Sequence, residues 1–488
     1  MKTPPAALRG PAGSSDSQPE WPAAGSLAGP AERARFGKAA RGLVPREGHA
    51  ALDLPFDRPD PVDLLELQAS SRLPELVPVR YGRMLVSPLA YFRGSAVAMA
   101  SDLAASPVTG FTVQACGDAH LGNFGVFSCP QGGLVFDISE FDETLAAPWE
   151  WDVKRLAASV EIAGRENGLA AKQRRKAVLA AVRGYREAML AFARMTALDI
   201  WYARLDLDGA GTELQSAANG SSHKAAGQSV IKARTRDTLQ PLAKLTAVVD
   251  GRRQIVADPP LIVPVSDLPA TPDTGDDEPR IGDLLAACRH TLPQDGARLL
   301  ASYELGSLAR KVVGVGSVGT RCWIVLMQDS NDSDPLFLQV KEAERSVLSD
   351  FADPGQYENQ AERVVNGQRS TQAATDALLG WVRGADQIGG RRRDYYIRQL
   401  RDWKLSADLA GLSPGWLRRF AGYCGWTLAR AHARTGDRFA IGGYLGTSAV
   451  FDEAVGDFAA SYANQNERDY AELGRAAKSG RITVTKGL

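Results

Sequence analysis

The hydrophobic and polar pattern divides the first part of the chain into two segments. Residues 1–50 are rich in Pro, Gly, Ala and Ser with little periodic hydrophobicity, which predicts a disordered tail. Residues 51–205 contain a long region, from about Trp151 to Ala197, in which apolar residues recur at helical spacing. Gly168 predicts a break in this region. We therefore expect a largely helical unit after the tail.

The pattern changes twice in the rest of the chain. Residues 206–300 are irregular, which predicts an insertion and linker with one hairpin near Val249–Ile255. Residues 301–405 have the pattern of strands with a helical stretch between them. Residues 406–488 have the pattern of helices again. We therefore predict an α+β protein in which a β-rich unit separates two helical segments.

A polar motif interrupts the first helical unit. It reads Gly-Asp118-Ala-His120-Leu-Gly-Asn123, and Asp137 follows after the apolar run Gly133–Phe136. Phosphoryl transfer to a hydroxyl needs an Asp that accepts the proton of the nucleophile, an Asn that holds Mg²⁺ and a second Asp that holds Mg²⁺ across the phosphates. Asp118, Asn123 and Asp137 match these roles in this order. The apolar run predicts a buried strand that holds Asp137 rigidly.

Three further polar residues lie near this motif. His120 is a candidate catalytic residue that orients the loop, and a histidine held by backbone hydrogen bonds is the alternative. Glu140 and Asp142 follow the predicted strand. We expect them to be solvated loop carboxylates, and assistance in metal binding is the alternative.

A glycine-rich segment lies between two β-like runs in the 301–405 unit. It contains Gly314, Gly316, Ser317 and Gly319 in a G-x-G-S-x-G arrangement. The same letters open a helix in dinucleotide-binding folds, but Thr320–Met327 is β-branched, aromatic and apolar, which favours a strand. A glycine-rich hairpin between strands is what a kinase places over the phosphates of ATP, because missing side chains let backbone N–H groups approach. We therefore predict that these four residues bind a nucleotide.

The next predicted strand carries a single lysine near its end. Lys341 follows Gly319 by 22 residues, and it resembles the strand lysine that pairs the α- and β-phosphates of ATP. The helix that follows should supply its acidic partner, for which we select Glu362. The competing carboxylates are Glu342, Glu344 and Glu358.

Two stretches resemble known families. The motif over residues 117–123 resembles the catalytic loop of the aminoglycoside phosphotransferase and choline kinase branch of the protein-kinase-like fold. The wider run through Pro148–Ser159 is similar to the bacterial family DUF2252, a likeness that extends from about residue 45 to 475. The resemblance implies that Asp152 braces the catalytic loop, and it supplies no substrate.

The order of the motifs departs from that of a kinase. The glycine loop and the lysine precede the catalytic loop in a kinase, whereas here they follow it by about 190 residues. The resemblance therefore implies a bilobal protein-kinase-like fold that is circularly permuted, with a β-rich nucleotide lobe over 301–405 and a helical catalytic lobe from 51–205 and 406–488. Residues 426–433 resemble the helix that precedes the catalytic loop in phosphotransferases.

The composition limits the binding partners and the cellular location that we expect. The formal net charge of the 488-residue chain is zero, so nothing global favours nucleic acid or an anionic membrane. No apolar run approaches the length of a membrane-spanning helix, and we see no secretory signal. The five scattered cysteines argue against a zinc site or a disulfide framework. We expect a cytoplasmic protein.

These features predict an ATP- and Mg²⁺-dependent phosphotransferase that acts on a hydroxyl of an unidentified acceptor. The resemblance favours a small-molecule acceptor. Two alternatives stay open: a nucleotide-binding pseudokinase or scaffold, and an AMP transferase that binds ATP in the reverse sense. A two-metal phosphoesterase is disfavoured because it needs several further His and Asp ligands, and the chain has five histidines. The sequence makes no prediction of oligomeric state.

Overall fold

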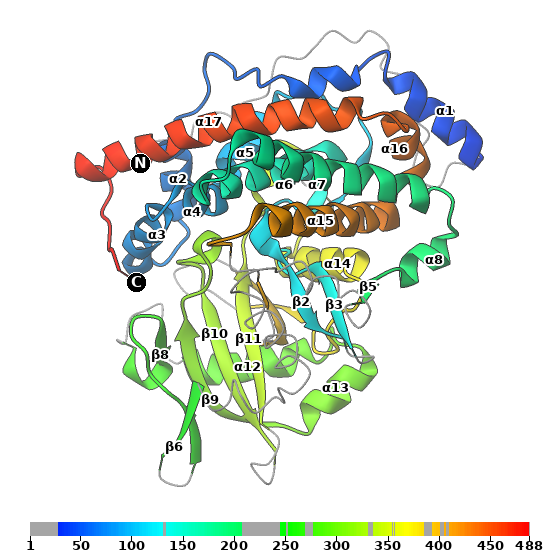
Figure 1. The fold of residues 1–488 in the computed structure, drawn as a ribbon. Helices are drawn as coiled ribbons and strands as arrows, with labels where there is room; N and C mark the ends of the chain where they lie inside the picture. Colours follow the sequence, from blue (N-terminus) through cyan, green and yellow to red (C-terminus); the bar gives the residue numbers. More distant parts are fainter. Residues whose placement is uncertain are drawn as a thin grey trace.

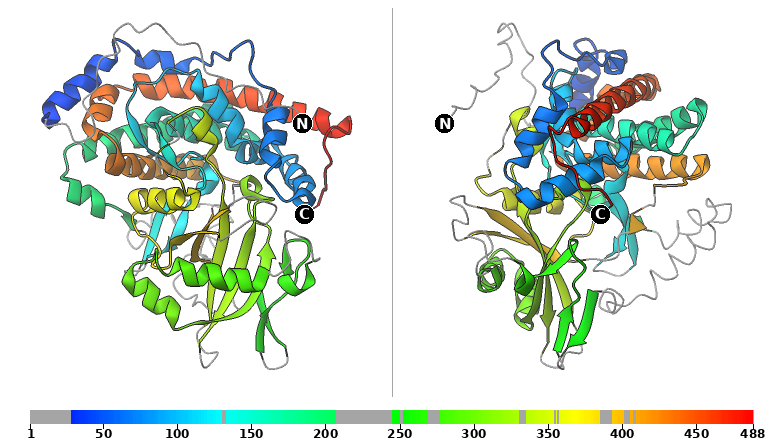
Figure 2. Two further views of the ribbon diagram at one scale, coloured as in Figure 1. Left: turned by 180° about the vertical axis from the view of Figure 1, so that it is seen from behind. Right: turned by 90° about the vertical axis from the view of Figure 1, so that its left-hand side faces the viewer.

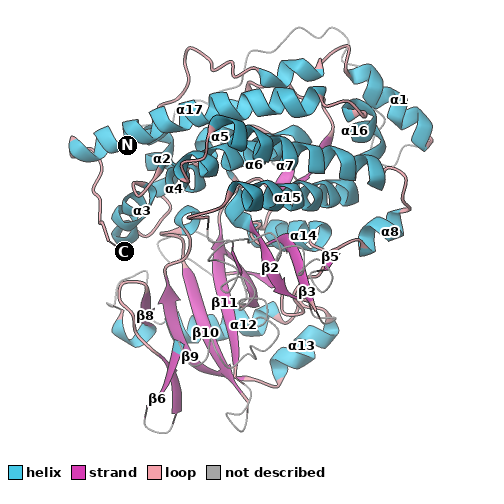
Figure 3. Ribbon diagram, viewed as in Figure 1, coloured by secondary structure: helices cyan, strands magenta, loops and turns pink. Residues whose placement is uncertain are grey.

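A layer of helices lies against a β-sheet, with most of the helices in the upper half and the sheet, together with two further helices, in the lower half of Figure 1. The computed structural model describes residues 28–129, 133–206, 245–249, 252–268, 277–329, 335–353, 355, 357–384, 393–400, 405–406 and 409–487. Figure 3 shows the same division by element type, and the side view of Figure 2 shows the helices stacked above the sheet. Among the described helices, none is both long and apolar enough to cross a membrane.

The helical part is built from both ends of the chain. Its helices are α1 (Pro30–Ala40), α2 (Pro61–Ala69), α3 (Val77–Met84), α4 (Pro88–Gly94), α5 (Ala96–Ala104), α6 (Trp149–Glu166), α7 (Ala171–Phe192), α8 (Ala197–Tyr202), α15 (Pro414–Thr435), α16 (Arg438–Leu445) and α17 (Val450–Lys478). Helices α7 and α15 pack along each other. Their backbones approach so closely that a Cβ atom on Gly425 would lie 2.0 Å from the carbonyl oxygen of Ala181. Segments far apart in the sequence therefore share one core.

The sheet has six antiparallel strands in the order β12-β13-β11-β10-β9-β8. Their bounds are β8 (Ile262–Pro264), β9 (Glu304–Lys311), β10 (Cys322–Gln328), β11 (Leu336–Ala343), β12 (Gly380–Arg383) and β13 (Asp394–Gln399). Strand β10 is buried on both faces, because alternate side chains enter two different cores. Helices α12 (Asp277–Cys288) and α13 (Gln294–Ala301) contribute to one core. Helix α14 (Gln360–Thr371) lies between the sheet and α15.

Two smaller sheets position the polar motif. Strands β2 (Phe124–Ser128) and β3 (Leu134–Ile138) form a hairpin that β5 (Leu205–Asp206) and β14 (Leu405–Ser406) extend. Strand β1 (Thr112–Ala115) pairs with β4 (Leu145–Pro148), so that Ala115 lies opposite Leu145. The loop between β1 and β2 is therefore held at both ends by paired strands.

Several predictions about the elements are confirmed. The fold is a mixed α+β fold, and the long helical region is α6 and α7 with Gly168 between them. The predicted hairpin is β6 (Thr246–Val249) paired with β7 (Arg252–Ile255). Strand β3 is buried at every position, as the apolar run before Asp137 predicts.

Two boundaries are wrong. The predicted disordered tail contains α1, which packs against α16 and carries an ion pair of 2.7 Å between Arg33 and Asp437; residues 1–27 lie outside the described residues. The predicted insertion and linker over 206–300 contains β8, α12 and α13, which belong to the six-stranded sheet and its core, while residues 207–244 lie outside the described residues. In both cases tertiary packing stabilises elements whose local pattern is weak.

Candidate active site

Two neighbouring cavities lie where the six-stranded sheet meets the polar motif. The first has a volume of about 550 Å³ and lies between the strands and the segment after β3. The second has a volume of about 40 Å³ and lies beside the loop between β1 and β2. Glu140, Gly314 and Ser317 line both cavities. The glycine loop therefore borders both spaces.

The glycine loop contains a 3₁₀ turn over Val315–Ser317 and joins β9 to β10 as predicted. Gly314, Gly316 and Ser317 line the cavities. Arg72 holds the loop from outside by donating to the carbonyl oxygens of Gly316, at 2.9 Å, and of Val318.

Gly319 lines neither cavity and faces Arg72 instead. Its φ of +93° lies in the left-handed region that favours glycine. The structure therefore corrects the prediction for Gly319, which forms the turn at the end of the loop.

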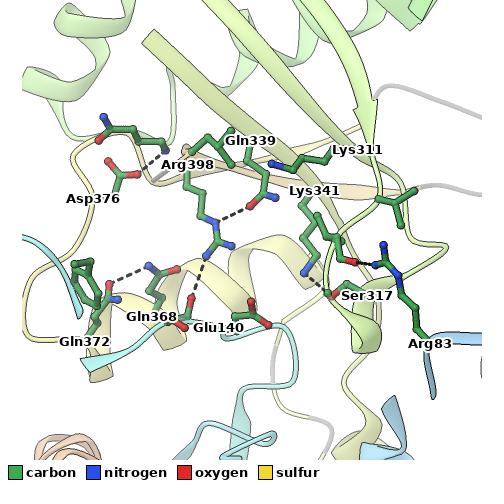
Figure 4. Close-up of a pocket in the computed structure, with 17 residues that line it drawn as sticks. Arg83, Glu140, Lys311, Ser317, Gln339, Lys341, Gln368, Gln372, Asp376 and Arg398 are labelled. Carbon is green, nitrogen blue, oxygen red and sulfur yellow. Dashed lines mark hydrogen bonds between the residues drawn. The ribbon is translucent and has the colours of Figure 1, made fainter. Parts of the chain in front are cut away.

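Lys341 projects from β11 into the first cavity, and Figure 4 shows its amine beside Ser317. Its Nζ atom lies 2.6 Å from Oδ2 of Asp142 and 2.8 Å from Oγ of Ser317. Burial is the largest single influence on the pKa of Lys341 and lowers it, but the charge of Asp142, together with Tyr396 and Glu140, raises that pKa above its ordinary value. Burial likewise opposes ionisation of Asp142, yet the lysine holds the pKa of Asp142 below its ordinary value. The two side chains thus form a charged pair.

The acidic partner of Lys341 is therefore Asp142, and the prediction of Glu362 is wrong. Helix α14 instead directs Arg363 towards the segment after β3, where it donates to the carbonyl oxygens of Asp142 at 2.9 Å and Thr144 at 2.6 Å. Arg363 also donates to the carbonyl oxygen of Glu344, just after β11, at 2.8 Å. The competing carboxylates have other partners: Glu342 pairs with Arg321 and Arg393, Glu344 accepts from Ser71, and Glu358 lies near Arg383.

The expectation of a solvated loop carboxylate is wrong for Asp142. Tyr396 donates to Oδ1 of Asp142 at 2.9 Å, so both carboxylate oxygens of Asp142 have partners. Glu140 is half-buried and lines both cavities. Contacts with strands late in the chain decide the environment of Asp142, and no local pattern encodes such contacts.

Asp118 lies at the second cavity, with a side chain 17% exposed. Arg155, on α6, lies 2.6 Å from Oδ1 of Asp118 and fixes its orientation. The amide nitrogen of Asn123 donates to the backbone carbonyl of Asp118 at 2.7 Å. Asp118 and Asn123 therefore lie together, as predicted, at the second cavity.

Asp152 braces the loop, as the resemblance implies. Its two oxygens accept the N–H groups of Cys116 at 2.6 Å and of Gly117 at 2.9 Å. His432, on α15, lies 3.2 Å from the same carboxylate and contacts Tyr185 through its other ring nitrogen. Helices from both halves of the chain thus hold one loop.

His120 is held by the backbone. Its Nδ1 atom accepts the N–H of Gly122 at 3.0 Å, which leaves the ring proton on Nε2, 3.6 Å from Asp118. Burial lowers the pKa of His120 to about 4, an effect that the charge of Asp118 opposes and the charges of Arg93 and Arg155 reinforce. His120 is therefore neutral near pH 7 and orients the loop beside Asp118.

Asp137 lies outside both cavities, and its predicted metal-binding role is corrected. Its side chain is fully buried, with Oδ1 2.6 Å from Nη2 of Arg430 on α15. Its Oδ2 atom accepts the N–H of Ala373 at 2.7 Å. Asp137 therefore ties β3 to α15 and to the residues that follow α14.

The oxygen donors at the cavities suit a hard cation. Asn123, Glu140 and Asp142 line the second cavity. Within the described ranges, no three His, Cys, Asp or Glu side chains are grouped closely enough to hold a metal ion. Mg²⁺ is commonly bound by one or two carboxylates together with substrate phosphates and water. A Mg²⁺ ion at these oxygen donors would need further ligands from a bound phosphate or from water.

The first cavity is rich in cations that the sequence motifs did not reveal. Arg83, Lys311 and Arg398 line it together with Lys341. Arg398 donates to Oε1 of Gln339 at 2.9 Å and to the carbonyl of Ser139 at 3.2 Å, which links the strands to the segment after β3 (Figure 4). A cavity lined in this way favours an anionic ligand.

Comparisons with known proteins give one match. Neither a curated protein nor a solved structure matches the chain. The model of the family described as an uncharacterized protein conserved in bacteria (DUF2252) matches residues 72–476, and the chain therefore belongs to the DUF2252 family.

Proposed function

We propose that this protein is an ATP- and Mg²⁺-dependent phosphotransferase with a circularly permuted protein-kinase-like fold. The observation that carries the proposal is the contact of Lys341 with both Asp142 and Ser317. This contact joins the third strand of a sheet, the segment after the polar motif and a glycine loop, which are far apart in the sequence. Asp118 and Asn123 lie next to the same loop.

The order of elements within the sheet supports a kinase-like nucleotide lobe. Strands β9 and β10 flank the glycine loop, β11 carries the lysine, and helix α14 follows. Protein kinases likewise cover the phosphates with a glycine-rich loop and place the lysine on the third strand. The lysine of a kinase pairs with a Glu of the next helix, whereas Lys341 pairs with Asp142.

A contact between a helix late in the chain and a strand early in the chain supports the permutation. Helix α15 ends beside β1, where Oγ1 of Thr435 accepts the N–H of Gln114 at 3.2 Å. The helix that resembles the one before a phosphotransferase catalytic loop thus adjoins the strand that leads into Asp118. The unpermuted order would follow if α15 were linked to β1 and the chain were opened between β5 and β9, ahead of the glycine loop.

The residues at the two cavities have different roles in the proposed reaction. Lys341, Ser317 and the exposed backbone of Gly314 and Gly316 hold the phosphates of ATP. Asp118, oriented by Arg155, accepts the proton of the acceptor hydroxyl. Catalysis then rests on positioning and on preorganised charge, without a covalent enzyme intermediate.

Asn123, Asp142 and Glu140, in place of Asp137, would hold Mg²⁺ through their side-chain oxygens. The cation would supply positive charge against the phosphates. Asp142 is paired with Lys341, so the lysine would have to leave this carboxylate in order to contact a phosphate.

The test is product analysis after incubation with ATP, Mg²⁺ and a pool of small hydroxyl compounds. We expect ADP and a phosphorylated compound from the wild type. Asp118→Asn should lower turnover by about 10²–10⁴-fold, the usual contribution of a general base, and should keep nucleotide binding. AMP with an adenylylated product would identify an AMP transferase. A wild type that binds the nucleotide but forms no product would be a pseudokinase or scaffold.

A further inference from the structure

The wall of the second cavity that faces Asp118 carries unpaired positive charge. Arg72, Arg80 and Arg93 lie on or behind this wall, and none of the three forms an ion pair within the described part of the chain. Arg72 and Arg80 donate to backbone carbonyls, of Gly316 and Gly94 respectively, at 2.9 Å each. Arg80 is fully buried, and burial lowers its pKa, an effect that the charge of Arg72 reinforces.

Arg93 is the member of this group that lines the cavity. Its Nε atom is buried and has no hydrogen-bond partner. The guanidinium lies close to the catalytic loop, because a Cβ atom on Gly122 would lie 3.3 Å from that Nε atom. A buried N–H group without a hydrogen-bond partner is costly, so a ligand that accepts from this Nε atom gains binding energy.

Two carboxylates of the cavity are paired with other cations. Asp118 is paired with Arg155, and Asp142 is paired with Lys341. Glu143 accepts the N–H of Val347 at 2.7 Å. Glu140 also lines the cavity, but Arg93 forms no ion pair within the described part of the chain. The positive charge of Arg93 therefore remains available to a ligand.

The position of Arg93 separates it from the nucleotide phosphates. It lines the second cavity with Asp118 and His120, and it does not line the first cavity that Lys341 and Arg398 enter. We propose that Arg93 binds an anionic group, a phosphate or a carboxylate, that the acceptor carries near its reacting hydroxyl. This inference rests on the proposed phosphotransferase function, and it assigns the acceptor to the class of anionic hydroxyl compounds.

The experiment compares three small hydroxyl probes: glycerol, glycerol 3-phosphate and glycerate. Melting temperatures are recorded for the wild type, Arg93→Gln and the exposed control Arg345→Gln, each with Mg²⁺ and a non-hydrolysable ATP analogue present. We expect the phosphate or the carboxylate probe to raise the melting temperature of the wild type and of Arg345→Gln, and glycerol to leave it unchanged. The apparent Kd of the effective probe should rise about tenfold or more in Arg93→Gln. A response to only one anionic probe identifies which anion is bound.

Three results would overturn the inference. Equal responses to glycerol and to both anionic probes, including no response to any of them, would show that the site does not select an anion. An anionic response that persists in Arg93→Gln would place the anion elsewhere. Loss of the nucleotide-induced shift in Arg93→Gln would assign Arg93 to the nucleotide instead. A wild type that shows no nucleotide-induced shift would instead refute the proposed function, which keeps the two failures distinguishable.

Discussion

The buried ion pair between Asp137 and Arg430 distinguishes a structural carboxylate from a metal ligand. The side chains are 0% and 1% exposed, and their closest atoms are 2.6 Å apart. Asp137→Ala leaves the guanidinium of Arg430 buried without this partner, and it removes the acceptor of the Ala373 N–H. Removing one member of a buried ion pair costs about 3–5 kcal/mol. We expect the free energy of unfolding to fall by about that amount.

Urea unfolding followed by tryptophan fluorescence measures this change. The double variant Asp137→Ala/Arg430→Met should recover much of the loss, because it leaves no unpaired charge in the core. Asp350→Ala is the matched control, since Asp350 forms an exposed ion pair with Arg345 and should change stability by less than about 1 kcal/mol.

A specific result would refute this reasoning. If Asp137→Ala kept wild-type stability and lost Mg²⁺-dependent nucleotide binding, Asp137 would be the metal ligand that the motif spacing predicts. Asp142→Asn should instead lose Mg²⁺-dependent nucleotide binding, because Asp142 contacts Lys341 at the cavity.

Three further predictions concern the loops at the site. Asp152→Ala removes the partner of two backbone N–H groups and should cost about 1–3 kcal/mol while lowering turnover; unchanged turnover in the folded variant would argue against the bracing role. Gly319→Ala forces a left-handed conformation and should cost about 1–2 kcal/mol in thermal unfolding, whereas Gly474→Ala, at an open helical position, should be neutral or stabilising. Folding lowers the pKa of His120 from 6.5 to about 4, so between pH 4 and 6.5 this side chain is protonated in the unfolded chain and neutral in the folded protein. Stability should therefore fall as the pH drops from about 6.5 towards 4, more steeply in the wild type than in His120→Gln; parallel pH profiles of unfolding would contradict this.

The local pattern predicts the elements around the site well. The β-branched and aromatic run after the glycine loop forms strand β10, and the apolar run before Asp137 forms the buried strand β3. Lys341 lies on the expected strand, β11, because a short apolar run between polar turns is typical of a buried strand. Helix α1 was missed because its stability comes from packing on α16 rather than from its own periodicity.

The partners of charged residues could not be predicted in the same way. Asp142 meets Lys341 across 199 residues, and Asp137 meets Arg430 across 293 residues. Both carboxylates lie on or just after one buried strand, and the sequence does not tell which of them faces the helices and which faces the cavity. Motif spacing therefore selected Asp137, and tertiary packing places Asp142 at the site.

Calorimetric titration of ATP tests the central claim most directly, namely that the glycine loop, Lys341 and Asp142 form one nucleotide site. We predict binding to the wild type that depends on Mg²⁺, and a Kd about tenfold or more higher for Lys341→Met. The double variant Lys341→Met/Asp142→Asn, which leaves no unpaired charge, should fold and should also bind weakly. No binding of ATP to the wild type, or equal binding to the folded double variant, would contradict the account.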